Sequence, residues 1–259
     1  MKNGVVLLIV LLTNTQIYNF KINRAILSTN ENPMYIDFWP IVAKAWKQLI
    51  GVTPTLALIA PQNVPIDTSL GDVIRFEPIP GIPTGYQAQV IRNLLPSLFP
   101  NDFCIIGDID MIPVNKNYLI GSALPFAEKN FVVYRNLAYG PRTVGYPMCY
   151  NAAKGSTFAE IFNVKNKKDI YDIIKYWHTI NNGWSADEQL LFKYLHNWKF
   201  HKSRCRYLNQ TVLARLDRGK WNPKVTLLKK HAYIDIHSIR PYKQHEQHLL
   251  WIAQELGIQ

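Results

Sequence analysis

Two aspartates one residue apart, Asp108 and Asp110, are the residues of this 259-residue chain whose types and spacing suggest chemistry most directly. They follow an apolar run, Phe103–Ile106, that is typical of a buried strand. Side chains alternate along a strand, so an extended chain directs both carboxylates to one side. Adjacent anions are costly to remove from water, and hard divalent cations prefer carboxylate oxygen. The pair therefore predicts a metal site, with an N-cap or an Asx-turn as the structural alternative.

The segments around this motif indicate an α/β protein. Strand-like runs and helix-like periodicity follow one another in the order strand, helix, two strands, helix, strand. These segments span residues 25–29, 34–50, 53–60, 72–79, 84–99 and 103–106. Later runs predict strands at 131–136 and 144–153, helices at 169–180 and 186–198, and a short strand with a His-rich turn within 228–242. This order is typical of a sheet with helices on its faces, which binds ligands at the carboxyl ends of its strands.

Two enzyme classes place an Asp-x-Asp triplet directly after a strand. In haloacid-dehalogenase-like phosphatases the first aspartate is a nucleophile, and a small hydroxylated residue normally follows the triplet two positions on. The present chain has Ile112 there, and its triplet lies in mid-chain. In glycosyltransferases of the GT-A fold the triplet holds Mn²⁺ or Mg²⁺ against a nucleotide diphosphate, and the order of elements is the one given above.

Four motifs favour the second class. In VIRNLLPSLFP, Arg92 precedes two prolines by four and eight residues, and CIIGDIDMIPV matches a metal-binding strand. ADEQLLFKYL matches an acid-Gln-acid helix start, although Glu188 and Gln189 stand in reverse order. HSIRP matches a closing His followed by a basic-Pro pair, with a shorter spacing than usual between the His and that pair. From about Arg24 to Tyr242 the chain resembles GT-A glycosyltransferases, nearest the retaining galactosyl/glucosyltransferase-like group (family 8-like) and domains that build capsid glycans in large algal viruses. The resemblance implies a GT-A nucleotide-diphospho-sugar transferase fold, with a mixed central sheet flanked by helices.

The resemblance also implies a set of metal ligands. Asp108 corresponds to the aspartate that touches both ribose and metal, and Asp110 to the one that chelates the metal. His237 corresponds to the third ligand because Arg240 and a proline follow it, while His231 is the alternative. Two carboxylates with one neutral imidazole suit Mn²⁺, and Mg²⁺ is the other candidate.

Further residues are implied for binding the donor. Arg92 corresponds to a contact with the donor sugar or the diphosphate, with a solvated helix arginine as the alternative. The first turn of the fold holds the nucleotide base and ribose, and here it contains Thr29, Asn30 and Asn32. Ordinary turn chemistry is the alternative for all three.

Asp187 is the candidate catalytic residue, expected to act on the transferred sugar itself. It lies at the start of a helix, so a capping role is the alternative. Asn151 is a weaker candidate for a sugar contact. Four aromatic residues are candidates for stacking on sugar rings: Tyr86, Tyr139, Tyr146 and Trp184.

The function that follows is metal-dependent transfer of a sugar from a nucleotide-sugar donor, expected to be a UDP-sugar, to a carbohydrate or glycan acceptor. A metal-dependent phosphatase and a non-catalytic nucleotide-sugar-binding protein are the alternatives. The net charge of +11 lies entirely in residues 131–259, since residues 1–130 contain nine basic and nine acidic residues. No long basic run or zinc-finger spacing accompanies that charge, so nucleic acid is not an expected partner.

The N-terminus predicts an appendage to a single domain. Residues 5–12 are apolar, a length typical of a signal-peptide core and too short to span a bilayer. Residues 1–20 are therefore a signal-like leader, a membrane-surface anchor or an extra strand, and 21–259 form one glycosyltransferase domain. Three cysteines without CxxC spacing favour a reducing compartment. Localisation thus stays open between cytoplasmic and secretory or membrane-associated.

Overall fold

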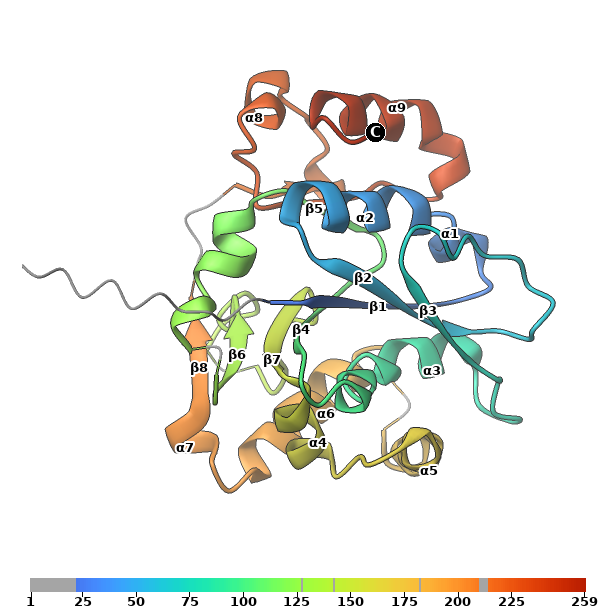
Figure 1. Cartoon of the computed structure of the whole chain (residues 1–259), viewed down its shortest axis with the longest axis vertical. Coiled ribbons are helices and arrows are strands. Elements are labelled where there is room, and N and C mark those ends of the chain that lie inside the picture. The colour runs from blue at the N-terminus through green and yellow to red at the C-terminus, as the bar shows by residue number, and fades with distance from the viewer. Residues whose placement is uncertain (1–21, 127, 142, 182, 210–213) are drawn as a thin grey trace, which may run out of the picture.

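The computed structural model describes residues 22–259 except 127, 142, 182 and 210–213 (Figure 1). The predicted leader, anchor or strand of residues 1–20 lies outside the described residues. Within the described ranges, no helix has the combined length and apolar character needed to cross a bilayer.

A seven-stranded mixed sheet forms the centre of the molecule, in the order β3-β2-β1-β4-β7-β6-β8. Its strands are β1 (Arg24–Asn30), β2 (Thr53–Ile59), β3 (Asp72–Phe76), β4 (Phe103–Gly107), β6 (Phe131–Tyr134), β7 (Tyr150–Lys154) and β8 (Cys205–Leu208). The first four strands of that order are parallel, and β7 runs antiparallel to both of its neighbours. The carboxyl ends of β1 and β4 therefore lie at the same edge of the sheet.

Helices cover both faces of this sheet (Figure 1). They are α1 (Pro33–Ile36), α2 (Trp39–Ala45), α3 (Thr84–Ile91), α4 (Gly155–Phe162), α5 (Lys167–Ile180), α6 (Ala186–Asn197), α7 (His201–Arg204), α8 (Val225–Lys229) and α9 (Tyr242–Glu255). Alternate residues of β1 serve the two faces, because Ala25 and Leu27 belong to a core shared with α2 and α9, whereas Ile26 belongs to one shared with α3 to α6. The helix-and-sheet prediction is thus confirmed, although α9 was not predicted.

Short turns interrupt two segments that the periodicity predicted as single helices. Residues 34–50 form α1, α2 and the π-turn η1 (Trp46–Ile50), and Pro40 occupies the first turn of α2. Residues 84–99 form α3 and the 3₁₀ turn η2 (Leu95–Leu98), which contains Pro96. A proline has no N–H to continue an α-helical ladder, which is consistent with the helix ending before it. Other 3₁₀ or π turns are η3 (Asn117–Gly121), η4 (Leu124–Phe126) and η5 (Arg218–Lys220).

A second, three-stranded sheet connects the middle of the chain with its C-terminal part. It contains β5 (Met111–Pro113), β9 (Leu216–Asp217) and β10 (Asp235–His237), with β10 in the centre. In the antiparallel pairing of β5 with β10, His237 lies opposite Met111. In the parallel pairing with β9, His237 lies opposite Asp217. The residue that follows Asp110 is thereby placed beside the predicted third ligand.

Candidate active site

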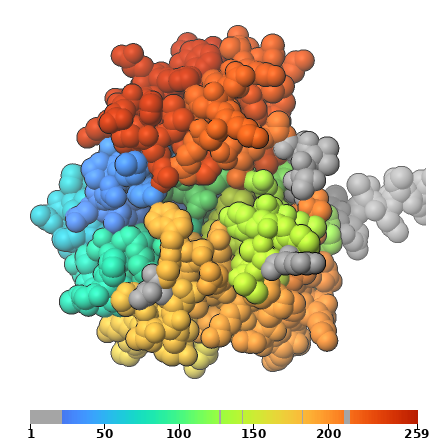
Figure 2. Space-filling view, turned by 180° about the vertical axis from the view of Figure 1, so that it is seen from behind, coloured from blue at the N-terminus to red at the C-terminus, as the bar shows by residue number. Residues whose placement is uncertain are grey.

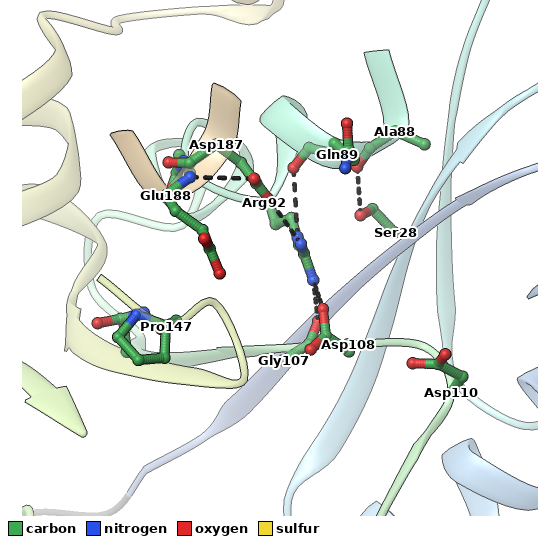
Figure 3. A network of polar contacts seen from close by, with 12 residues as sticks. Ser28, Ala88, Gln89, Arg92, Gly107, Asp108, Asp110, Pro147, Asp187 and Glu188 are labelled. Atoms are coloured by element: carbon green, nitrogen blue, oxygen red, sulfur yellow. Dashed lines mark hydrogen bonds and ion pairs between the residues drawn. The ribbon is translucent and has the colours of Figure 1, made fainter. Parts of the chain in front are cut away.

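An ion-pair network on Arg92 forms the buried part of the site (Figure 3). Arg92 follows α3, and its guanidinium contacts the carboxylate of Asp108 after β4 and that of Asp187 in the first turn of α6. The distance from Arg92 Nη2 to Asp187 Oδ2 is 2.5 Å. The Arg92 and Asp187 side chains are 9% and 3% exposed, whereas Asp108 is 28% exposed. The sequence named all three residues, and the structure brings them together.

The network shifts the pKa values of its members in different directions. Burial lowers the pKa of Arg92, but Asp108 and Asp187 outweigh it and raise that pKa above its ordinary value. Burial raises the pKa of Asp108, but the attraction of Arg92 outweighs it and the net shift is downward. Asp187 is buried more deeply, and its pKa is raised in spite of Arg92. Asp108 is therefore held as an anion on the side that is open to solvent.

Asp110 meets a different set of arginines. Its carboxylate is 6% exposed, and its Oδ2 lies 3.0 Å from Arg218 Nη1 and 3.6 Å from Arg240 Nη1. The backbone carbonyl of Asp110 accepts a hydrogen bond from Ser238 N at 3.0 Å. Two arginines of the basic second half thus neutralise an acid of the neutral first half.

His237 lies next to these arginines in a defined orientation. Its Nδ1 lies 3.1 Å from Asp217 Oδ2, so a neutral ring donates from Nδ1 and has its acceptor lone pair on Nε2. Nε2 contacts the guanidinium of Arg218. His231, the alternative ligand, lies elsewhere, with Nε2 3.1 Å from the carbonyl oxygen of Leu256. The geometry thus places His237, and not His231, on the side of Asp110.

The donor chemistry of Asp110 and His237 fits a divalent cation. Both converge on one cationic group, the Arg218 guanidinium, and the carboxylate of Asp217 fixes the imidazole in the manner typical of metal-ligating histidines. Asp108 turns to Arg92 instead, so the three predicted ligands do not form one cluster. Across the part of the chain that the structure describes, no group of three His, Cys, Asp or Glu side chains is arranged to hold a metal.

The three predicted base- and ribose-binding residues lie at the end of β1. The Thr29 hydroxyl donates to the carbonyl of Asn30 at 3.0 Å, and Asn30 Nδ2 donates to Thr84 Oγ1 at 3.0 Å. Asn32 caps α1, since its Oδ1 accepts from Met34 N at 3.0 Å. These contacts shape the turn, and nucleotide binding by its residues stays a prediction.

Asn151 lies inside the sheet on β7. It is fully buried, and its Nδ2 donates to the carbonyl of Pro147 at 2.8 Å. The side chain thereby fixes the loop before β7. A contact between Asn151 and the sugar stays a prediction.

Glu188 is the site residue that sequence reasoning did not select. It follows Asp187 on α6, and its Oε1 accepts a hydrogen bond of 2.7 Å from the hydroxyl of Tyr139. The available signal was the helix start itself, where Glu188 stands at the position that holds Gln in the resembling family. Of the aromatic candidates, Tyr86 and Tyr146 are 6% exposed, whereas Trp184 is 78% exposed.

The space-filling view shows a hollow between the C-terminal segments and the middle of the chain (Figure 2). The orange and red C-terminal segments lie above the hollow, and the yellow segments lie below it. Green atoms from the middle of the chain are visible deeper inside. Segments far apart in the sequence therefore form its rim.

Comparison with known proteins identifies the fold. No protein-family model and no curated protein matches the chain. Among solved structures it is similar to the glycosyltransferase GlyE of Streptococcus pneumoniae TIGR4, with a TM-score of 0.50 and 12% identity over 92% of this chain and 60% of that one. It is also similar to the galactosyltransferase LgtC in complex with donor and acceptor sugar analogues, with a TM-score of 0.52 and 10% identity over 90% of this chain and 95% of that one. The chain has the GT-A type glycosyltransferase fold, as its motifs predicted.

Proposed function

We propose that this protein is a metal-dependent glycosyltransferase that moves a sugar from a UDP-sugar to a carbohydrate acceptor. The observation that supports it best is the carboxylate pair Asp108 and Asp110 after a central strand of a GT-A type fold, with Asp110 and His237 both in contact with the Arg218 guanidinium. LgtC, whose structure holds donor and acceptor sugar analogues, has the same fold. The fold alone hosts more than one function, so the proposal depends on these side chains.

Asp110 and His237, which both contact the Arg218 guanidinium, are the residues that would hold Mn²⁺ or Mg²⁺, and Asp108, which pairs with Arg92, is the third proposed ligand. When bound there, the ion would supply Lewis-acid stabilisation of the negative charge on the leaving nucleotide diphosphate. Arg92 would orient Asp108 and balance its charge. Arg218 and Arg240, which lie at Asp110, would add positive charge beside the diphosphate.

The remaining predicted residues have roles in binding the donor. Thr29, Asn30 and Asn32 form the turn after β1, at the edge of the sheet where nucleotides bind in such folds. Asp187 would hold Arg92 in place, and the loop fixed by Asn151 would lie over the transferred sugar.

The two alternatives differ from this proposal in what they release or retain. A phosphatase would release inorganic phosphate from a phosphomonoester, and a binding protein would bind a UDP-sugar without turnover. Release of UDP from a UDP-sugar separates glycosyl transfer from both alternatives.

The deciding experiment is a thermal-shift panel followed by a turnover assay. Nucleoside diphosphates with different bases are tested with and without Mn²⁺, because a bound ligand raises the apparent melting temperature by mass action. We expect UDP with Mn²⁺ to give the largest shift, and UDP-glucose or UDP-galactose to release UDP. Equal shifts for all bases without metal dependence, together with no UDP release, would contradict the proposal.

A further inference from the structure

Asp187 is the acid predicted to act on the sugar, but both of its carboxylate oxygens already have a partner within the protein. Its Oδ2 is paired with Arg92 at 2.5 Å, and its Oδ1 accepts a hydrogen bond from Glu188 N at 3.0 Å. With a side chain 3% exposed, it is enclosed by its own partners. Its geometry is that of a residue that positions Arg92.

The next residue along α6 has the opposite character. Glu188 is half-buried, and its carboxylate extends into the space between α6 and the segment from Gly107 to Asp108, opposite Pro147 (Figure 3). Its backbone is held by the loop before β7, since its carbonyl accepts from Tyr146 N at 3.3 Å. That bond ties the start of α6 to the loop before β7, and the hydrogen bond from the Tyr139 hydroxyl holds the carboxylate itself.

The charges around Glu188 adjust its basicity. Burial raises the pKa of Glu188, the hydrogen bond from Tyr139 lowers it, and the anions Asp187 and Asp108 raise it while Arg92 lowers it. The net shift is upward from the ordinary value of a glutamate. A carboxylate whose pKa lies closer to neutrality is a better proton acceptor at physiological pH.

The surroundings of Glu188 also distinguish two sides of the site. The Arg92–Asp187 pair behind it is almost fully buried, whereas Tyr139 beside it is 53% exposed. Trp184, in the segment just before α6, is 78% exposed, and its carbonyl oxygen accepts a 2.7 Å hydrogen bond from Gln89 on α3. Exposed aromatic rings on anchored segments offer flat surfaces for sugar rings, so this is the side from which an acceptor would enter.

We propose that Glu188 is the general base that receives the proton of the acceptor hydroxyl; this inference rests on the function proposed above. The acceptor oxygen forms a bond to the anomeric carbon as its O–H proton passes to the Glu188 carboxylate. The bond between that carbon and the diphosphate oxygen breaks, and its electron pair leaves with UDP. Glu188 then releases the proton to solvent, which returns the site to its starting state.

The first test replaces Glu188 by glutamine in the full-length protein with Mn²⁺. UDP release from UDP-glucose or UDP-galactose is measured across pH, with water as the acceptor. We expect Glu188→Gln to lower kcat about 100-fold or more, as loss of a general base does. The acid limb of the wild-type pH profile should disappear, while the Kd for UDP from calorimetry stays unchanged. Glu160→Gln, on the outer side of α4, is the matched control and should behave as wild type.

The second test changes the pKa of Glu188 without touching its carboxylate. The Tyr139 hydroxyl stabilises the anion by donating to it, so Tyr139→Phe should raise the pKa of Glu188. The acid limb of the pH profile of kcat/KM should therefore move to higher pH. The variant should lose less activity at alkaline pH than at acidic pH. A purely structural role of Tyr139 would lower activity equally at all pH values.

Three results would overturn the base role. A Glu188→Gln variant that keeps near wild-type kcat in an active enzyme would overturn it alone. A glycosyl adduct trapped on Glu188 and detected by mass spectrometry would show that it attacks the sugar itself. A wild-type protein that binds UDP and Mn²⁺ but never releases UDP would overturn both this inference and the proposed function.

Discussion

The two aspartates of the triplet have different cationic partners although they are one residue apart. Arg92 contacts Asp108, and Arg218 contacts Asp110. The residue types and their spacing were sufficient to predict a charged site. Arg218 was not predictable as a partner of Asp110, because it comes from a distant turn that only the pairing of β9 with β10 places there.

At this scale the two histidines allow a direct test of the metal site. His237→Ala is expected to weaken Mn²⁺ binding well beyond the roughly 10-fold that a change outside the ligand sphere produces. His231→Ala should change it little, because its ring contacts the carbonyl of Leu256. Calorimetric titration of both variants with Mn²⁺ gives the two affinities. Equal and small losses would mean that His237 is not a ligand.

The raised pKa of Glu188 predicts a specific dependence of stability on pH. The pKa of Glu188 is higher in the folded state than in the unfolded state, so the folded state binds more protons at pH values between the two. The free energy of unfolding therefore falls as the pH rises through this range. Below the unfolded value both states are protonated and the effect vanishes. Glu188→Gln should thus be more stable than wild type at pH 7 and equal to it at acidic pH.

Urea denaturation of wild type and variant at a series of pH values measures this difference. A glutamine keeps an acceptor for the Tyr139 hydroxyl, so the comparison isolates the charge. A variant less stable than wild type at pH 7 would mean that the carboxylate stabilises the fold instead.

At the scale of elements, Arg92 joins three parts of the chain. Its guanidinium contacts residues that follow β4 and that begin α6, while its own backbone follows α3. The sequence placed Arg92 on a helix and the aspartates after a strand and at a helix start. The contact of Arg92 with both aspartates could not be predicted from the sequence, because it depends on how α3 and α6 pack on one face of the sheet.

Replacing this arginine should therefore cost stability as well as activity. Arg92→Met leaves the almost fully buried Asp187 without a counter-charge, and breaking a buried pair in this way costs about 3–5 kcal/mol of the free energy of unfolding. Urea denaturation at pH 7 provides the measurement.

Lys168→Met is a suitable control for that variant. Lys168 forms an exposed pair with Asp172 on α5, and such pairs contribute little. An Arg92→Met protein as stable as this control would show that Asp187 is protonated or solvated in the folded state.

At the scale of the whole molecule, local pattern predicted the first half better than the second. Strands β1 to β4 follow directly from apolar runs, whereas α9 was missed and β7 covers only the end of its predicted range. The short strand predicted within residues 228–242 is present as β10, but the sheet that it forms with β5 and β9 was not predicted, because those two strands are only three and two residues long and a pattern needs more positions than that. The fold class could thus be predicted, while the assembly around His237 could not.

The apolar run of residues 5–12 leads to a prediction about loss of the N-terminal residues. If this run is a signal-like leader or an anchor, deleting residues 2–18 is expected to leave the urea midpoint and UDP binding unchanged, which denaturation and calorimetry would check. A large loss of stability would mean that the deleted segment is a strand of the sheet and not a leader or an anchor.

The distance along the chain between Asp110 and its partners also has a consequence during translation. About a hundred residues separate Asp110 from Asp217 and Arg218, which corresponds to roughly 5 to 20 seconds of synthesis. Throughout that interval the nascent chain presents β5 as an unpaired strand and Asp110 without its arginines. An unpaired strand can associate with other chains, so a ribosome-associated chaperone has a defined period in which to protect this one. Residues 216–237 have to emerge and dock before Asp110 meets Arg218 and His237 takes its place beside β5, so the candidate site is incomplete until that part of the chain has been made.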